Sequence, residues 1–329
     1  MLPTLRQLRY LKLLADHGSF SRAAEAAHVT QPTLSAGIQE LEKILGPALV
    51  DRSRAGVILT AAGHEAAGRA RALLAQAEDL VREARGAGEP LGGRFRLGVI
   101  PTIAPFLLPA ALPALRASYP KLRLYLREDL THRLLAEVRS GGLDAALVAL
   151  PYDTAGFEFA HVVDDELLAA LPAGHRLCQA ERIAPRRLEG EDLILLEDGH
   201  CLRDHALMAC GPAALRRGDE NFAATSLATM VQMVGSGLGV SFIPAMAVAA
   251  GLTSSAAIAV RPLDADNTRR QVVVIWRQGS TRKREGQLLA EFFRPDADLD
   301  PAAGGMESPT GADRDVRAGS DCTISEPHE

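Results

Sequence analysis

The sequence predicts an α/β protein in three parts: a small helical domain that ends in a β-wing, one long helix, and a two-lobed domain. Three observations support this fold class. Short helix patterns separated by turn signals fill residues 1–60, an Ala-rich and charge-rich helix pattern covers 61–85, and strand and helix patterns alternate over 94–294. A Gly-rich run at 86–93 separates the long helix from the two lobes, and we expect a hinge there.

Composition is typical of a soluble globular protein. The chain has 329 residues, 47% hydrophobic and 23% charged, which is enough for two or three domains. We find no apolar run that could span a membrane and no signal-peptide core, so we expect a cytoplasmic protein without a membrane partner. The cysteines are too few and too scattered for a secreted disulfide framework; they are Cys178, Cys201, Cys210 and Cys322.

Charge is unevenly distributed along the chain. The segment 295–329 holds nine acidic residues and two arginines, a net charge of −7, and we expect it to be a disordered acidic tail. The rest of the chain holds 34 basic and 32 acidic residues, a net charge of +2. The overall charge of −5 therefore does not exclude a nucleic-acid partner.

The first part of the chain reads as three short helices. A leucine-lined helix ends near Gly18, Ser19 can cap a second helix over 20–27, and Thr30 can cap a third that runs to about Leu45. Two helices joined by a short turn, the second of which starts with small polar residues, are typical of a helix-turn-helix. A plain three-helix bundle with polar caps would show the same helices.

Polar side chains at the start of the third helix favour the DNA-binding interpretation, because hydroxyl and amide groups there can contact base edges or phosphates. The segment 49–60 adds weight, since it reads as strand, turn and strand with two arginines that could grip phosphate. The candidate DNA contacts from these two segments are Thr30, Gln31, Thr33, Ser35, Arg52 and Arg54.

The two-lobed domain follows from alternating strand and helix patterns. The first lobe is expected over 94–165 with 268–294, and the second over 166–267. A cleft between such lobes, at the carboxyl ends of strands, is a usual ligand site. The predicted strands are 94–100, 122–128, 143–150, 167–171, 193–196, 239–243 and 272–277, and the predicted helices are 104–117, 130–140, 226–235 and 282–293.

Two cysteines nine positions apart, Cys201 and Cys210, suggest a redox switch. If the segment between them is helical, their α-carbons are roughly 13 Å apart, whereas a disulfide tolerates at most about 7 Å. Joining the two thiols would therefore require the helix to unwind. His200 and Arg203 place positive or polarisable groups beside Cys201 and are expected to favour its thiolate, while Cys210 resembles a resolving thiol.

Two other interpretations of these cysteines stay open at this point. They could be inert core residues. They could also bind a metal together with His200 and His205, but neither a CxxC motif nor a second Cys/His cluster accompanies them. We therefore expect no metal and no cofactor.

The order of the parts resembles the LysR-type transcriptional regulators, and the similarity covers residues 1–294. It implies a winged helix-turn-helix, a linker helix that dimerises, and a regulatory domain with two α/β subdomains like those of periplasmic binding proteins. It also implies promoter DNA as a partner, a homo-oligomer built as a dimer of dimers, RNA polymerase as a candidate partner, and no enzyme activity. Ser21, Arg22 and Pro32 join the candidate DNA contacts. The motifs that carry the resemblance are 18–24, 29–35, 41–42, 59–63, 226–231 and 237–240.

The segment 197–204, together with Cys210, resembles family members that sense hydrogen peroxide and control antioxidant genes. In that resemblance Cys201 is the peroxide-reactive cysteine, and Cys210 resolves its sulfenic acid to a reversible disulfide. The implied pocket residues are Thr102, Thr131, His200, Arg203 and Asp204.

Three features depart from that pattern: His205 stands where glutamine is usual, Val50 where phenylalanine is usual, and the acidic tail has no counterpart. Two other functions remain to be distinguished. One is a LysR-type regulator that binds a small organic effector in the cleft, and the other is a thiol peroxidase that uses Cys201 as its nucleophile.

Overall fold

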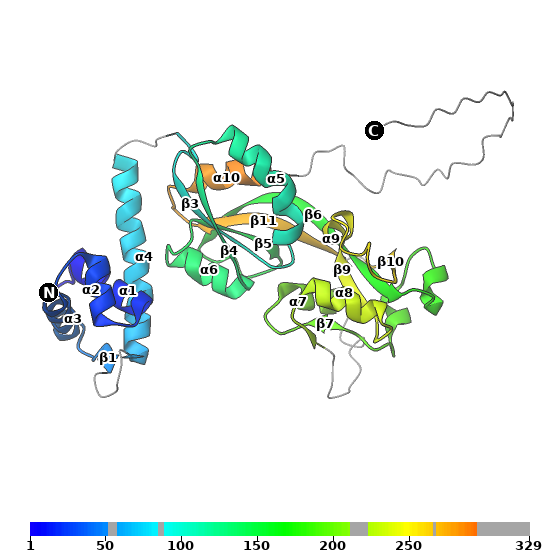
Figure 1. The fold of residues 1–329 in the computed structure, drawn as a ribbon, viewed down its shortest axis with the longest axis horizontal. Helices are drawn as coiled ribbons and strands as arrows, with labels where there is room; N and C mark the ends of the chain where they lie inside the picture. The colour runs from blue at the N-terminus through cyan, green and yellow to red at the C-terminus, as the bar shows by residue number, and fades with distance from the viewer. Residues whose placement is uncertain (52–57, 85–88, 211–222, 266–267, 295–329) are drawn as a thin grey trace, which may run out of the picture. The chain divides into compact units, whose positions relative to one another are not determined.

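The computed structural model describes most of the chain, and Figure 1 shows its elements; the described ranges are 1–51, 58–84, 89–210, 223–265 and 268–294. Several features predicted from the sequence lie outside these ranges. They are Arg52 and Arg54 of the expected wing, residues 86–88 of the expected hinge, Cys322, and the acidic tail.

The N-terminal domain begins with α1 (Leu5–His17), α2 (Phe20–Ala27) and α3 (Gln31–Leu45), as the sequence predicts. Each boundary has a local cause. Gly18 ends α1 in the left-handed conformation (φ 60°), and the Thr30 side chain caps α3 by accepting a hydrogen bond from Thr33 N. Ser19 occupies the cap position of α2, but its side chain makes no capping hydrogen bond.

Apolar faces of these helices form one small core, in which Leu11, Leu14, Leu34, Ile38 and Leu41 are fully buried. A two-stranded antiparallel pair, β1 (Val50–Asp51) and β2 (Ile58–Leu59), follows α3. The long helix α4 (Ala61–Ala84) contributes two buried alanines to the same core, which are Ala67 and Ala70.

The first lobe is built on three parallel strands and the helices that connect them. The strands lie in the order β4-β3-β5, and the antiparallel strand β11 extends the sheet beyond β5. These elements are β3 (Arg94–Val99), α5 (Ala104–Ser118), β4 (Arg123–Glu128), α6 (Thr131–Arg139), β5 (Ala145–Leu150) and β11 (Arg269–Arg277).

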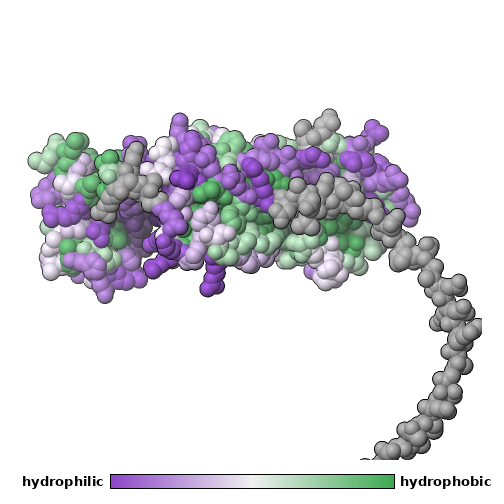
Figure 2. Space-filling model, turned by 90° about the horizontal axis from the view of Figure 1, so that it is seen from above, coloured by the Kyte–Doolittle hydropathy of each residue, from purple (hydrophilic) through white to green (hydrophobic). Residues whose placement is uncertain are grey.

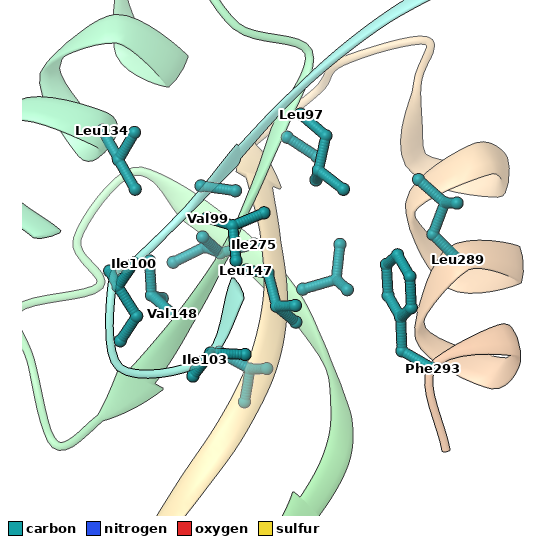
Figure 3. Close-up of a cluster of buried hydrophobic side chains, with 14 of the residues drawn as sticks. Leu97, Val99, Ile100, Ile103, Leu134, Leu147, Val148, Ile275, Leu289 and Phe293 are labelled. Carbon is teal, nitrogen blue, oxygen red and sulfur yellow. The ribbon is translucent and has the colours of Figure 1, made fainter. Parts of the chain in front are cut away.

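Helices cover both faces of this sheet. Figure 3 shows Leu289 and Phe293, from α10 (Lys283–Phe292) and its C-cap, facing the strand residues, while Leu134 of α6 lies on the other side of the strands. All of these side chains are fully buried. Burial on both faces explains why all six residues of β5 are apolar.

One long strand, β6 (Phe157–Pro172), belongs to both lobes. Its first ten residues run along β11 of the first lobe, all paired except Val162 at a bulge, and from Leu167 onward it pairs with β9 (Ser241–Pro244) and β10 (Ile258–Pro262). The sequence predicts only the second half of β6, at 167–171, and predicts neither β10 nor the short helix α9 (Ala245–Ala249).

The second lobe has its own buried core, separate from that of the first. Two short 3-10 helices, η1 (Arg176–Gln179) and η2 (Pro185–Leu188), precede the parallel pair β7 (Leu195–Leu196) and β8 (Ala223–Ala224). Two helices complete the lobe, α7 (Cys201–Cys210) and α8 (Leu227–Gly235). Ser226 caps α8 by accepting a hydrogen bond from Thr229 N.

None of the helices in the described ranges is both long and apolar enough to cross a membrane. On the face seen in Figure 2, hydrophilic residues are spread widely, with smaller hydrophobic groups among them.

Candidate functional site

Cys201 lies at the boundary between the two lobes. It is the first residue of α7, its side chain is 5% exposed, and it belongs to the core of the first lobe. The following residues of the same helix, Leu202, Ala206 and Ala209, belong to the core of the second lobe. Helix α7 therefore packs against both cores, with Cys201 in the first and the residues after it in the second.

A glycine brings Cys201 into this position. Gly199 has a positive φ of 95°, and a Cβ atom there would come within 3.0 Å of Leu130 Cδ1 from the residue before α6. Only glycine tolerates both the backbone conformation and this approach without strain. The chain can therefore pass close to the start of α6 before it turns into α7.

Arg270 is the cation of the site, and sequence reasoning did not find it. Its side chain is fully buried on β11, and its Nε atom lies 2.9 Å from Oδ2 of Asp165 on β6. Its Nη1 donates to Thr102 Oγ1 at 2.8 Å, and its Nη2 donates to the Thr102 carbonyl at 3.0 Å. Because an unpaired buried guanidinium is very costly, these partners fix its position.

Burial and charge act in opposite directions on Cys201. Burial raises the pKa of its thiol above the ordinary value, because the thiolate is poorly solvated there. The positive charge of Arg270 and the hydroxyl of Thr131 work against this, while Asp204 adds to it. Arg270 is therefore the group that most favours the reactive thiolate.

Both of the expected pocket threonines lie near this thiol. Thr102 holds Arg270, as described above, and the buried Thr131 is the first residue of α6. The Thr131 hydroxyl favours the Cys201 thiolate but makes no hydrogen bond of ordinary geometry within the described part of the chain. Neither threonine acts as a helix N-cap, since Ile103 and Leu130 occupy those positions.

His200 and Arg203 were expected to place positive or polarisable groups beside Cys201, whereas the cation that acts on its thiol is Arg270. Arg203 instead donates to the Leu196 carbonyl and pairs with Asp198, with Nε 3.0 Å from Oδ1. Burial lowers the pKa of His200, so its imidazole is neutral at pH 7. The charge comes from Arg270, which lies 69 residues further along the chain.

His205 lies one turn after Cys201 on α7 and is only 4% exposed. Neither of its ring nitrogens makes a hydrogen bond of ordinary geometry within the described residues. Burial and the nearby Arg270 lower the pKa of His205 to about 4, against a smaller effect of the Pro151 carbonyl. The ring is therefore neutral at pH 7.

Cys210 is the last residue of α7, so the helix runs without a break between the two cysteines. Cys201 is a free thiol. Ten residues of helix hold the two α-carbons roughly 13 Å apart, beyond the reach of a disulfide. Within the described ranges, no group of three or more His, Cys, Asp or Glu side chains could hold a metal ion.

The candidate DNA contacts gather at the start of α3. Gln31, Pro32 and Thr33 are exposed there, as are Ser21 and Arg22 on α2, while Ser35 is half-buried. Ser21 Oγ donates to Gln31 Oε1 at 2.9 Å, and this bond limits the conformations that the glutamine can adopt. An exposed polar helix start that is held by a neighbouring helix suits insertion into a DNA groove.

Comparison with known proteins places the chain in a family. Residues 5–64 match the bacterial regulatory helix-turn-helix protein, lysR family, and residues 88–298 match the LysR substrate binding domain. The protein belongs to the LysR family of bacterial regulatory proteins.

Individual relatives match three quarters of the chain or more. A "Hydrogen peroxide-inducible genes activator" of Pectobacterium carotovorum is 38% identical over 290 residues, 88% of this chain and 95% of that protein. The "HTH-type transcriptional regulator EstR" of Acinetobacter baylyi is 43% identical over 247 residues, 75% of this chain and 81% of that protein. The solved structure of a full-length OxyR variant from Pseudomonas aeruginosa superposes with a TM-score of 0.76 at 35% identity, and covers 89% of this chain and 95% of that one.

Proposed function

We propose that this protein is a transcriptional regulator that senses hydrogen peroxide through a reversible disulfide between Cys201 and Cys210 and controls antioxidant genes. The observation that carries the proposal is the position of Cys201. The thiol lies between the cores of the two lobes, with Arg270 to favour its thiolate, and it begins the helix that ends at Cys210. The peroxide-responsive name of a relative that spans the chain supports the same function.

The chemistry needs two steps. The Cys201 thiolate attacks one oxygen of hydrogen peroxide, the O–O bond breaks, and the leaving hydroxide takes up a proton and departs as water. The sulfur is now a sulfenic acid. The Cys210 thiolate then attacks that sulfur, a second hydroxide leaves and is protonated to water, and the disulfide forms.

Disulfide formation would change the regulatory domain because α7 must unwind first. Unwinding would withdraw Cys201 from the core of the first lobe and disturb Leu202 and Ala206 in the core of the second. The angle between the lobes would change as a result, and with it the placement of the DNA-binding domains.

Each of the three parts of the chain has its own role in this proposal, in the order typical of the family. In this proposal residues 1–60 bind promoter DNA through α3, residues 61–85 pair with a second copy, and residues 94–294 sense peroxide. A dimer of dimers in the cytoplasm, with RNA polymerase as a candidate partner and without enzymatic turnover, completes the proposal. Exposed apolar side chains on α4 support the pairing role, and they are Leu73, Leu80 and Val81.

The deciding experiment is peptide mapping by mass spectrometry of the reduced protein after treatment with one equivalent of hydrogen peroxide. The expected product is a Cys201–Cys210 disulfide that dithiothreitol reverses. In Cys210→Ser, Cys201 should stop at the sulfenic acid, which dimedone traps. If both thiols stay free in the wild-type protein, the proposal is wrong.

A regulator that answers to an organic effector is the main alternative, because the relative with 43% identity is not named for peroxide. Cys201→Ser distinguishes the two, since it should abolish a peroxide response in promoter binding but leave an effector response intact. A thiol peroxidase would instead consume many equivalents of peroxide per protein when a reductant is supplied, and a sensor would not.

A further inference from the structure

The long helix α4 is attached to the N-terminal domain along one stretch of its length. Ala67 and Ala70 are buried in the core of that domain, and Arg71 Nη2 donates to Asp16 Oδ1 of α1 at 2.6 Å. Two buried side chains and an ion pair fix both the position and the rotation of the helix, so α4 and the N-terminal domain move together. About one turn further along, at Ala75, α4 lies against the first lobe.

Asp79 of α4 makes two polar contacts with the first lobe, inside the compact unit that residues 1–295 form. Its Oδ2 accepts a hydrogen bond from Arg277 Nη2 at the end of β11, and its Oδ1 accepts one from Thr281 Oγ1 at 2.8 Å in the turn before α10. The Asp79 and Arg277 side chains are each only 16% exposed. Salt screens a sheltered ion pair less than a surface one, so we expect this contact to persist at physiological ionic strength.

A glycine of the first lobe allows α4 to approach this closely. Gly141, in the turn after α6, has a positive φ of 75°, and a Cβ atom there would lie 2.1 Å from the Cβ of Ala75. Any other residue at this position would therefore strain the turn and push the helix away. Shape and charge thus complement the lobe along the same stretch of α4, residues 75–79, which is about one helical turn long.

Strand β11 connects this contact with the redox site. Arg270, the cation that acts on Cys201, is the second residue of the strand, and Arg277 is the last. Residues 272–276 between them are fully buried, and the strand lies between β5 and β6 in the sheet. A strand packed this tightly on both sides cannot bend by itself, so both arginines follow the same movement of the first lobe.

We propose that Asp79, with Arg277 and Thr281, is a clamp that holds α4 on the first lobe. A movement of that lobe is then transmitted to the DNA-binding domain through side-chain contacts as well as along the chain. In the proposed function the disulfide changes the angle between the lobes, and the clamped helix carries the DNA-binding domain with the first lobe. This consequence for regulation rests on the proposed function, whereas the clamp itself does not.

The first experiment tests the clamp in the reduced full-length protein and involves no peroxide. Arg277→Lys keeps the positive charge and supplies an amine, which a water-soluble carbodiimide joins to a carboxylate in contact with it. Peptide mapping of the monomer band by mass spectrometry should find position 277 linked to Asp79, and the link should be absent when Asp79→Asn is added. Lys283 and Glu158, with Nζ 2.6 Å from Oε2, give a positive control in the same digest. If that control link forms without the link to Asp79, the proposal is overturned.

A second variant tests the shape of the contact in the same Arg277→Lys background. Gly141→Ala should displace α4 and lower the yield of the link to Asp79 at least fivefold. Gly156 is the matched control, because its φ of 81° is also left-handed but no atom lies within 4 Å of a Cβ atom built there. Gly156→Ala should leave the yield unchanged, and urea unfolding establishes that both variants are folded. Equal yields in the two variants would mean that α4 does not rest on this turn.

The third experiment tests transmission to DNA. The probe is a DNA duplex that the oxidised wild-type protein selects from a random-sequence library, and fluorescence anisotropy gives its Kd for the reduced and oxidised forms. Asp79→Asn keeps an acceptor for Thr281 but removes the charge that Arg277 binds, and we expect the ratio of the two Kd values to be at least threefold closer to one than in the wild type. Glu65→Gln removes the same charge from an exposed ion pair of α4 and should keep the wild-type ratio.

The outcomes separate this inference from the proposed function. An unchanged Kd ratio in Asp79→Asn, in a sample whose Cys201–Cys210 disulfide has formed fully, would overturn the transmission through the clamp. If the wild-type protein forms no such disulfide, the proposed function fails, and the cross-linking still decides whether the clamp exists.

Discussion

Arg270 and Asp165 are direct partners in the register of the two strands that connect the lobes, and their side chains form a wholly buried ion pair. Asp165 stands where β6 stops pairing with β11 and begins to pair with β9. Its second oxygen accepts a hydrogen bond from Met246 N at the start of α9, at 3.0 Å. Through Thr102 on one side and Met246 on the other, the pair ties the first lobe to the second.

Removing one partner of this pair should therefore cost much more than removing both. Arg270→Met leaves Asp165 buried without its cation, and we expect a loss of about 3–5 kcal/mol in the free energy of unfolding. Arg270→Met with Asp165→Asn keeps an acceptor for Met246 N but removes the uncompensated charge, so it should recover most of that loss. Urea unfolding of the full-length reduced protein measures both values. Equal losses in the single and double variants would contradict this account.

Replacing Arg270 should also change the pKa of the Cys201 thiol. Arg270 is the cation that most lowers the pKa of Cys201, so in the double variant the thiol should ionise at a higher pH. The expected result is a slower reaction of Cys201 with iodoacetamide near pH 7, at least tenfold if the shift reaches one unit. Cys178, half-buried in the second lobe, gives an internal control in the same digest.

Helix α7 should unwind when the disulfide forms. The two thiols are the first and last residues of one continuous ten-residue helix, so the oxidised protein cannot keep this helix. Hydrogen exchange of peptides that cover 199–210 should become faster by orders of magnitude after oxidation, while peptides of β5 stay protected. Oxidised Cys210→Ser serves as the control and should exchange like the reduced protein. A disulfide that forms without loss of protection in α7 would refute the coupling.

The parts of this fold that sequence predicts well are those set by local chemistry. Thr30 followed by an apolar helical pattern predicts α3, and the nearly continuous apolar run of β5 predicts a buried parallel strand. The first half of β6 was missed because acidic residues such as Asp164 and Asp165 interrupt its apolar pattern. Its pairing partner β11 lies about 100 residues away.

The residues of the candidate site also fall into two groups, those that a local motif identifies and those that only the fold brings together. Cys201 and its neighbours belong to one continuous segment, so a motif identifies them. Arg270 and Asp165 are 105 positions apart in the sequence, and each taken alone looks like an ordinary charged residue. Only the register of β6 and β11 brings them together, where Arg270 also donates hydrogen bonds to Thr102. Arg203, which is only two positions from Cys201 in the sequence, pairs instead with Asp198.

DNA recognition by α3 offers a test that does not depend on redox chemistry. Gln31→Ala removes an exposed amide at the start of α3, and we expect binding to the cognate promoter to weaken by about 1–3 kcal/mol. Ser21→Ala removes the hydroxyl that orients Gln31 and that is itself a candidate DNA contact, and because a single neutral hydrogen bond is at stake its effect should be smaller, at or below about 1 kcal/mol. Gln39→Ala, at an exposed glutamine on the same helix, is the matched control. Fluorescence anisotropy at fixed salt measures all three; equal losses for Gln31→Ala and Gln39→Ala would rule out a specific contact.

The buried His205 should also make the folded protein sensitive to acid. Its pKa is lowered to about 4 in the folded state from an ordinary value of 6.5, so between these values the unfolded chain binds more protons. Stability is therefore retained above about pH 6.5 and lost as the pH falls toward 4, by up to about 3 kcal/mol from this group. His200, whose pKa is also lowered, contributes in the same direction.

The difference in pH-dependent loss of stability between the wild-type protein and His205→Gln isolates the share of His205. Urea unfolding of the reduced protein at pH 7 and pH 5 should show a smaller loss in His205→Gln than in the wild type, whereas His161→Gln should lose as much as the wild type. An equal loss in all three proteins would mean that His205 is solvated rather than buried when α7 is formed.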